Sequence, residues 1–327
     1  MSKKILVWLL ATVLLTTVAP TEAQQLTKVP RLGYLGSIPF SEFAARRDGF
    51  RQALRELGYT EGKNIFVEWR SAEGKLDRLA ALAAELVSLK VDIIVSASPT
   101  TTRSIKDATS TIPIVMAQDA DPVASGFAAS LSQPGGNVTG LTTLLPEISG
   151  KRLEILRETV PRLVRVAVLG ASTTPGTPQS LKETELAAEA FKMQVHYLDV
   201  LEAKDIEPAF QDASKWHADA LLILGGPFLL SRRTQIAELA VKNRFPAIYY
   251  SPEFVDDGGL MSYGVNFIDL HQRAAVYVDK ILKGAKPADL PIEQPKKFEF
   301  VINVKAAKQI GLTIPPNVLA RADRVIK

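Results

Sequence analysis

Short apolar segments alternate with helix-like segments along most of this sequence, and this alternation limits the possible folds more than any other feature. Between the apolar runs, hydrophobic residues recur at helical spacing. Strands separated by helices of this length are joined by right-handed crossovers and form a parallel sheet that helices cover on both faces. In the first half, the predicted strands are Arg31–Leu35, Ile65–Trp69, Asp92–Ala97 and Pro113–Met116, and the predicted helices are Phe43–Leu57, Leu76–Leu89 and Thr100–Ala108.

A Pro-Gly-Gly-Asn turn at 134–137 and the segment Val138–Leu141 interrupt this order, which then starts again. The second set has the same kinds of element in the same alternation. We therefore predict an α/β protein with two Rossmann-like lobes, each built on a parallel sheet. The predicted strands of the second set are Arg165–Leu169, Val195–Val200, Ala220–Leu224 and Ala247–Tyr250, and its helices are Ser149–Val160, Ser180–Phe191, Ile206–Trp216 and Thr234–Lys242.

The remaining C-terminal segments are too few for a third set. They comprise a strand at Gly258–Tyr263, a helix at Asp269–Leu282 and a strand at Phe298–Asn303. We expect these single elements to add to the two sheets that the earlier strands form. The chain must then cross between the lobes several times, and such crossings act as hinges. We predict a first lobe of residues 24–142 plus 251–290 and a second lobe of 143–250 plus 291–327. The candidate hinges are Thr142–Leu145, Tyr250–Phe254 and Lys286–Gln294.

The N-terminus has the three parts of a secretory signal peptide in the usual order. Lys3 and Lys4 precede an uncharged apolar run, Ile5–Val18, and a small-x-small site follows at 21–23. We predict that residues 1–23 are a signal peptide cleaved after Ala23; the alternative is an uncleaved anchor. The sequence has no cysteine, so a lipid anchor on an N-terminal cysteine is excluded, and we expect a soluble protein of the bacterial periplasm.

Composition and missing motifs exclude several classes of function. A hydrophobic content of 46% and a net charge of +4, without a basic block, argue against a disordered chain, a multi-span membrane protein and a nucleic-acid binder. Phosphate-binding loops, dinucleotide-binding turns and the nucleophile elbow of hydrolases are absent. The three histidines, His196, His217 and His271, lack zinc-binding spacing, and we interpret each as an ordinary surface or half-buried side chain. We therefore predict a non-enzyme without cofactor or metal, although spatially paired carboxylates remain an open possibility for catalysis.

The loops after the first set of strands carry groups that can hold a small solute, because ligands of open parallel sheets bind beyond the carboxyl ends of the strands. Ser37 follows the first strand, and Ser98, Thr100 and Thr101 begin a helix after the third, where hydroxyls and free N–H groups suit a carboxylate. Plain helix capping is the alternative. A carboxylate in the next loop, Asp119 or Asp121, suits an ammonium group, unless Asp121 caps the following turn.

In the second set and the C-terminal segments, the candidates are one hydroxyl, one amide and several aromatic rings. Aromatic side chains near the crossings can stack on an apolar or aromatic solute, although packing in the core or at a hinge is the alternative for each. These candidate ligand-binding residues are Ser172, Phe228, Tyr249, Tyr263 and Asn266.

Five groups of residues along the chain, taken in order, resemble one known family. They are Phe50–Tyr59 with Glu61–Asn64, Asp121–Val123, Gln133–Gly140, Gly259–Gly264 and Tyr277–Pro287. Together they are similar to the ABC-transporter substrate-binding proteins that include the tryptophan/tyrosine-binding type, over about residues 29–326. The resemblance implies the type I periplasmic binding protein fold, in which two lobes close on a solute that passes to a membrane permease and its ATPase. It also implies that Ser98, Thr100, Thr101, Asp119 or Asp121, and Asn266 hold an amino acid.

The most economical interpretation is therefore an extracytoplasmic solute-binding protein of an ABC importer that performs no covalent chemistry. The expected partners are a small solute, with an aromatic or branched amino acid as the leading class, and an inner-membrane permease. We expect a monomer. Two alternatives stay open: an exported α/β enzyme that uses an Asp or Glu of the cleft, and a periplasmic sensor that docks to a receptor.

Overall fold

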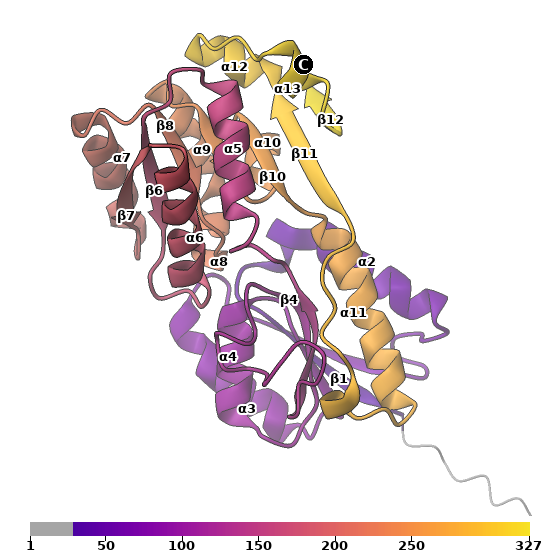
Figure 1. The fold of residues 1–327 in the computed structure, drawn as a ribbon. Coiled ribbons are helices and arrows are strands. Elements are labelled where there is room, and N and C mark those ends of the chain that lie inside the picture. The colour runs from indigo at the N-terminus through magenta and orange to yellow at the C-terminus, as the bar shows by residue number, and fades with distance from the viewer. Residues whose placement is uncertain (1–28) are drawn as a thin grey trace, which may run out of the picture.

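The computed structural model describes residues 29–327, which form two α/β lobes (Figure 1). The predicted signal peptide lies outside the described residues. The first lobe is built on five parallel strands in the order β2-β1-β3-β4-β5. These are β1 (Arg31–Gly36), β2 (Phe66–Ser71), β3 (Ile93–Ser96), β4 (Ile114–Asp119) and β5 (Val138–Thr142), and the helices that follow the first three are α2 (Ala44–Glu56), α3 (Leu79–Ser88) and α4 (Pro99–Ala108).

The second lobe is built on seven strands in the order β12-β11-β10-β9-β8-β6-β7. All neighbouring strands are parallel except the β10–β11 pair. The strands are β6 (Arg165–Gly170), β7 (Gln194–Asp199), β8 (Ala220–Ile223), β9 (Ala247–Tyr249), β10 (Met261–Val265), β11 (Phe298–Asn303) and β12 (Arg324–Ile326). The helices are α5 (Ser149–Thr159), α6 (Thr177–Ala190), α7 (Ile206–Lys215), α8 (Pro227–Ser231), α9 (Arg233–Lys242), α10 (Glu253–Asp256), α12 (Val304–Ile310) and α13 (Pro316–Leu319). The predicted pair of parallel-sheet lobes is confirmed.

Each face of the first sheet has its own hydrophobic core. Along β3, Ile93 and Val95 pack in the core that contains Phe50 of α2, whereas Ile94 packs in the core that contains Leu86 of α3. This division follows from the two-residue period of a strand. All three β3 side chains are at most 1% exposed, which explains why the strand is a continuous apolar run rather than an alternating one.

The chain crosses between the lobes three times, and the second and third crossings differ from the prediction. We predicted that residues 251–290 belong to the first lobe, but β10 pairs with β9 in the second sheet. The predicted hinge Tyr250–Phe254 therefore lies within the second lobe. The chain crosses instead between β10 and α11 (Phe267–Leu282), a helix that packs against α2 of the first lobe. In Figure 1, α11 lies beside the sheet of the first lobe although its residues are close in sequence to β10 and β11.

The third crossing begins later than we predicted, because residues 291–293 still belong to the first lobe. The N–H of Ile292 donates to the carbonyl of Leu131 (2.7 Å), and the N–H of Glu293 donates to that of Gly140 (2.9 Å). The chain then runs to β11 in the second lobe. The first crossing follows β5 where predicted, and Leu144 within it has a φ of 52°, which is unusual for a residue other than glycine. Between residues 29 and 327, no helix is long and apolar enough to cross a membrane.

Candidate functional site

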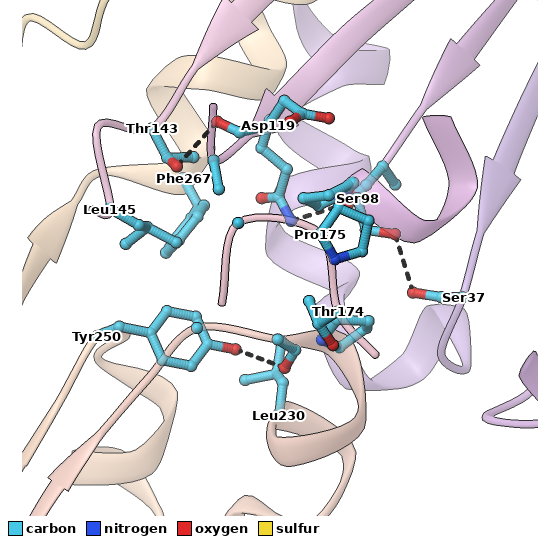
Figure 2. A pocket seen from close by; sticks show the side chains of 18 of the residues that line it. Ser37, Ser98, Asp119, Thr143, Leu145, Thr174, Pro175, Leu230, Tyr250 and Phe267 are labelled. Atoms are coloured by element: carbon cyan, nitrogen blue, oxygen red, sulfur yellow. Dashed lines mark hydrogen bonds between the residues drawn. The ribbon is translucent and has the colours of Figure 1, made fainter. Parts of the chain in front are cut away.

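A cavity of about 50 Å³ lies between the two lobes, at the carboxyl ends of strands from both sheets (Figure 2). Ser37 follows β1, Ser98 follows β3, Asp119 ends β4, and Gly225 follows β8; all four line the cavity. This is the position at which parallel α/β sheets bind ligands, because loops and helix N-termini gather there. Figure 2 shows Asp119 and Phe267 of the first lobe and Tyr250 and Leu230 of the second lobe on opposite sides of the same space.

Most of the cavity wall is apolar. Ile38, Phe43 and Phe267 come from the first lobe, Leu145 from the first crossing, and Leu230 from the second lobe. Tyr250 adds an aromatic ring, and its hydroxyl donates a hydrogen bond to the carbonyl of Gly226 (3.0 Å) instead of pointing freely into the space. Such a wall accommodates the hydrocarbon part of a small solute and excludes water around it.

Ser98 and the start of α4 form the first polar part of the wall. The Ser98 hydroxyl accepts a hydrogen bond from the N–H of Thr101 (3.2 Å), and the Thr101 hydroxyl accepts one from the N–H of Ser98 (2.9 Å). This capping box fixes the helix start, and Ser98 also lies 3.3 Å from Ser37, oxygen to oxygen. Ser37 and Ser98 line the cavity, whereas Thr100 and Thr101 do not. The positive end of this ten-residue helix therefore faces the cavity through Ser98 and Pro99, which favours a negative group there.

Asp119 is the second polar group. It is fully buried, and neither carboxylate oxygen has a hydrogen-bond partner among the described residues. Burial raises the pKa of Asp119 to about 7, although the nearby Thr102 hydroxyl and Ala120 N–H act in the opposite direction. An unpaired carboxylate in a closed space is costly, and a cationic group placed beside it removes that cost.

Arg46 of α2 connects the lobes at the edge of the cavity. Its side chain is 3% exposed and donates to Glu253 of α10 (Nε to Oε1, 2.9 Å), to Ser251 (3.0 Å) and to Gln118 of β4 (3.2 Å). The guanidinium also lies 4.0 Å above the centre of the Phe267 ring. Burial alone would raise the pKa of Glu253. The charge of Arg46 and the hydrogen bonds that Glu253 accepts, including one from Ser251, outweigh burial and hold this pKa below its usual value. Each of the three guanidinium nitrogens of Arg46 therefore already donates at least one hydrogen bond.

A second ion pair joins the lobes. Arg233 of α9 lies 2.9 Å from Glu42 in the first lobe and 3.1 Å from Asp257 in its own lobe. The lobes also meet closely where the backbone of Gly176 in the second lobe lies against the Ala120 side chain of the first. These contacts describe a closed arrangement of the lobes around the cavity.

His271 on the first turns of α11 also lines the cavity, and it is fully buried. Our interpretation of this histidine as a surface or half-buried side chain was wrong. Its Nδ1 lies 2.8 Å from the carbonyl oxygen of Phe267, and its Nε2 has no partner among the described residues. Burial, together with the Arg46 charge, lowers the pKa of His271 to about 3, so the ring is neutral at any ordinary pH.

Four predicted residues outside the cavity wall have other roles, three of them at turns or helix starts. Asp121 accepts hydrogen bonds from the N–H groups of Val123 (3.2 Å) and Ala124 (3.0 Å), which is the capping role we had left open. Asn266 caps α11 by accepting from the N–H of Asp269 (2.9 Å). The Ser172 hydroxyl donates to Asp199 (2.7 Å) at the end of β7. Phe228 is partly buried and packs against the hydrophobic core.

The two predicted tyrosines also lie outside the cavity wall. Tyr249 is fully buried and stacks on Phe254, with 4.7 Å between ring centres. Tyr263 stacks on Phe298 on β11, with 6.1 Å between ring centres. Of the eleven predicted residues, the structure therefore brings only Ser37, Ser98 and Asp119 together at the cavity.

Arg46 and His271 were not among the predicted site residues, yet the sequence contained a signal for both. Arg46 shares a helical face with Phe43 and Phe50, at spacings of three and four residues, so a cation occupied an otherwise apolar stripe. His271 follows Phe267 by one helical turn. A polar residue on a buried face needs a partner, which is supplied across the lobe boundary for Arg46.

The Arg46–Glu253 pair gives a testable expectation about the closed arrangement. Glu253→Gln leaves the Arg46 charge buried without its counterion, so the lobes are expected to separate and the free energy of unfolding to fall by about 1–3 kcal/mol. This is below the cost for a fully buried pair because the Glu253 side chain is 25% exposed. Small-angle scattering measures the expected increase in radius of gyration, and denaturant titration measures the stability.

The double variant Arg46→Met/Glu253→Gln is the matched control, since it removes both charges and leaves none uncompensated. It is expected to be more stable than Glu253→Gln alone. The single variant Arg46→Met completes the comparison. If the double variant loses as much unfolding free energy as the two single variants lose together, the pair does not couple the lobes.

Most of the described chain matches one known protein family. A family model described as "ABC transporter substrate binding protein" matches residues 40–326. Residues 29–327 contain no group of three or more His, Asp or Glu side chains placed to hold a metal ion. The family match agrees with the resemblance that the sequence motifs predicted.

Individual relatives point in the same direction. A protein named "Tyrosine-binding protein" from Clostridioides difficile is 24% identical over 266 residues, which is 81% of this chain and 76% of the relative. A solved structure of a conserved domain protein from Vibrio cholerae is 28% identical, with a TM-score of 0.87 over 91% of this chain and 100% of the other. A solved structure of an ABC domain in complex with L-Trp from Streptococcus pneumonia is 24% identical, with a TM-score of 0.85 over 91% of this chain and 99% of the other.

Proposed function

The chain belongs to the family of ABC transporter substrate-binding proteins, and from this we propose that it is the extracytoplasmic solute-binding component of an ABC importer. It captures a small solute between its lobes and delivers it unchanged to a permease in the inner membrane. The predicted signal peptide supports a periplasmic location. The two cross-lobe ion pairs support a protein that works by opening and closing. We propose that it does so as a monomer.

We propose an amino acid with a largely apolar side chain as the solute. The observation that carries this proposal is the buried, unpaired carboxylate of Asp119 in the cavity wall, which fits an α-ammonium group. The start of α4 at Ser98 fits an α-carboxylate, and the apolar wall fits the side chain. The relatives named for tyrosine and crystallised with L-Trp support an aromatic amino acid within this class.

Binding and closure are one process in this proposal. The solute lies between the lobes, so it touches both only when they are closed, and its affinity for the closed form shifts the population toward that form. The cavity wall combines side chains from both lobes, which is what such differential affinity requires. No step forms or breaks a covalent bond.

Ligand-dependent stabilisation tests the proposal. Purified protein is expected to gain about 2.7 kcal/mol of unfolding free energy at a solute concentration of roughly 100 times the dissociation constant. Differential scanning calorimetry with L-tryptophan, L-tyrosine, L-phenylalanine and L-leucine measures this gain, and mass spectrometry identifies any solute that co-purifies. N-acetyl-L-tryptophan, which has no ammonium group, is the control and is expected to have no effect. If no amino acid stabilises the protein and none co-purifies, the proposed ligand class is wrong.

A further inference from the structure

Two lining residues of the cavity, Asp119 and His271, carry fully buried polar side-chain atoms without a hydrogen-bond partner among the described residues. Among the described lining residues, the buried side-chain atoms without a hydrogen bond are the two carboxylate oxygens of Asp119 and Nε2 of His271. Two other polar lining groups already have partners, since Tyr250 donates to Gly226, and Gln118 bonds to Arg46 and to the carbonyl of Ala97. The hydroxyls of Thr174 and Ser180 also line the cavity. A buried polar atom without a partner is rare in proteins and calls for an explanation.

The protonation state of His271 follows from its other nitrogen. Nδ1 lies 2.8 Å from the carbonyl oxygen of Phe267, and a carbonyl oxygen only accepts hydrogen bonds, so Nδ1 carries the proton. Because the ring is neutral, Nε2 has a free lone pair and acts solely as an acceptor. Arg46 does not satisfy it, because its donors go to Glu253, Ser251 and Gln118.

Asp119 and His271 lie in different surroundings. The groups that act on the Asp119 carboxylate include Thr102 and Arg103 of α4, together with Asp121. His271 lies on α11 and has Arg46 of α2 and Glu253 of α10 as its charged neighbours. The two helix pairs cover separate hydrophobic cores of the first lobe, α3 with α4 on one side and α2 with α11 on the other. The unpaired acceptors therefore belong to two separate regions of the cavity wall.

We propose that His271 determines ligand specificity, in that its Nε2 accepts a hydrogen bond from an N–H or O–H group on the side chain of the bound amino acid. This inference rests on the function proposed above. The α-ammonium group pairs with Asp119, and the side chain extends past the apolar wall toward His271. The ligand class is then an apolar or aromatic amino acid with a side-chain donor, such as an indole N–H or a phenol O–H. A site built around such an acceptor rejects an analogue without the donor, since the acceptor stays buried and unpaired.

Two pairs of nearly isosteric amino acids test the inference by calorimetric titration. L-Tyrosine differs from L-phenylalanine by a hydroxyl, and in L-benzothienylalanine a sulfur replaces the N–H of L-tryptophan. The wild-type protein is expected to bind the donor-bearing member of at least one pair more tightly by about tenfold or more. In His271→Leu the ratio of the two affinities within a pair is expected to fall to about one, because the side-chain donor of the ligand then has no acceptor.

His271→Gln places an amide oxygen near the position of Nε2 and is expected to restore part of the ratio. His196→Leu, a histidine replacement outside the cavity, is expected to keep the full ratio, and thermal unfolding of each variant reports whether it folds. A wild-type ratio near one in both pairs, or a ratio that survives in His271→Leu, overturns the inference.

A wild-type protein that binds none of the four amino acids, and is not stabilised by L-leucine either, contradicts the proposed ligand class rather than the role of His271. The state of His271 is then tested alone by ¹⁵N NMR of the imidazole between pH 5 and 8. An unprotonated Nε2 throughout this range supports the acceptor role, and a protonated Nε2 overturns it.

Discussion

Asp119→Asn is expected to weaken the binding of an α-amino acid by about 100-fold, which corresponds to roughly 3 kcal/mol, and to leave the fold intact. The variant keeps the shape of the side chain but removes the charge that pairs with the α-ammonium group. Among the described residues, no other Asp or Glu lines the cavity. Because the Asp119 carboxylate makes no hydrogen bond with the described residues, the fold loses little when it is replaced. Isothermal titration measures the affinity, and thermal unfolding without ligand is expected to be unchanged or slightly raised.

The pH dependence of binding follows from the same group. The pKa of Asp119 is about 7, and an ammonium group beside it favours the charged form. Below pH 7, binding must therefore release a proton, so the affinity is expected to fall by about tenfold for each pH unit and to be constant above that pH. Titrations in two buffers of different ionisation enthalpy detect the released proton.

Without ligand, the same raised pKa works against folding. Between the ordinary Asp pKa and about 7, the folded state binds the proton and the unfolded state does not, so this group lowers the stability as pH rises through that range. Asp119→Asn is expected to lose both pH effects. An affinity that keeps its slope below pH 7 in the variant would show that another group titrates with binding.

Gly176→Ala is expected to reduce ligand affinity by about 10- to 100-fold, because it prevents the lobes from closing. A Cβ atom at position 176 would lie 2.5 Å from the Cβ of Ala120, which belongs to the other lobe. Each lobe can fold with this substitution, but the two cannot reach the closed distance. Small-angle scattering is expected to show a larger radius of gyration at saturating ligand than in the wild-type complex.

Two matched variants separate the collision from backbone strain. Gly176 has a φ of 87°, so an alanine there is also strained in its backbone, and Gly62 has a similar φ of 81° with open space around it. Gly62→Ala is therefore expected to lower stability without affecting closure. The double variant Gly176→Ala/Ala120→Gly removes the colliding atom and is expected to recover most of the affinity. If it does not, contact between these two residues is not what limits closure.

The lobes were predictable from the sequence because each strand and helix carries its own local signal. The apolar run of Ile93–Ser96 and the helix start at Ser98 are examples, since burial and capping act over a few neighbouring residues. The position of β10 was not predictable in this way. Met261–Val265 is a strand by its own pattern, but its pairing with β9 depends on the whole second sheet, and no local pattern specifies that partner.

The site was predicted only in part, for a related reason. Ser37, Ser98 and Asp119 lie at or just after the carboxyl ends of strands, so the rule about strand ends located them. Arg46, His271 and Tyr250 reach the cavity from two helices and from the segment after β9, and only the packing of α11 on α2 and the closure of the lobes bring them there. Polar residues that cap turns, such as Asp121 and Asn266, resemble ligand-binding residues in sequence because both roles use the same side-chain oxygens.

The late return of α11 to the first lobe has a consequence for how the protein is made. Phe50, Ala53 and Leu54 of α2 share a core with Ala274, Tyr277 and Val278 of α11, more than 200 residues further along the chain. A ribosome-bound nascent chain that ends before residue 266 therefore presents this apolar stripe to water and to holding chaperones. The second sheet likewise gains β11 only after α11. The first lobe is therefore complete only after residue 293 and the second only after β12, so both acquire their native cores late in translation.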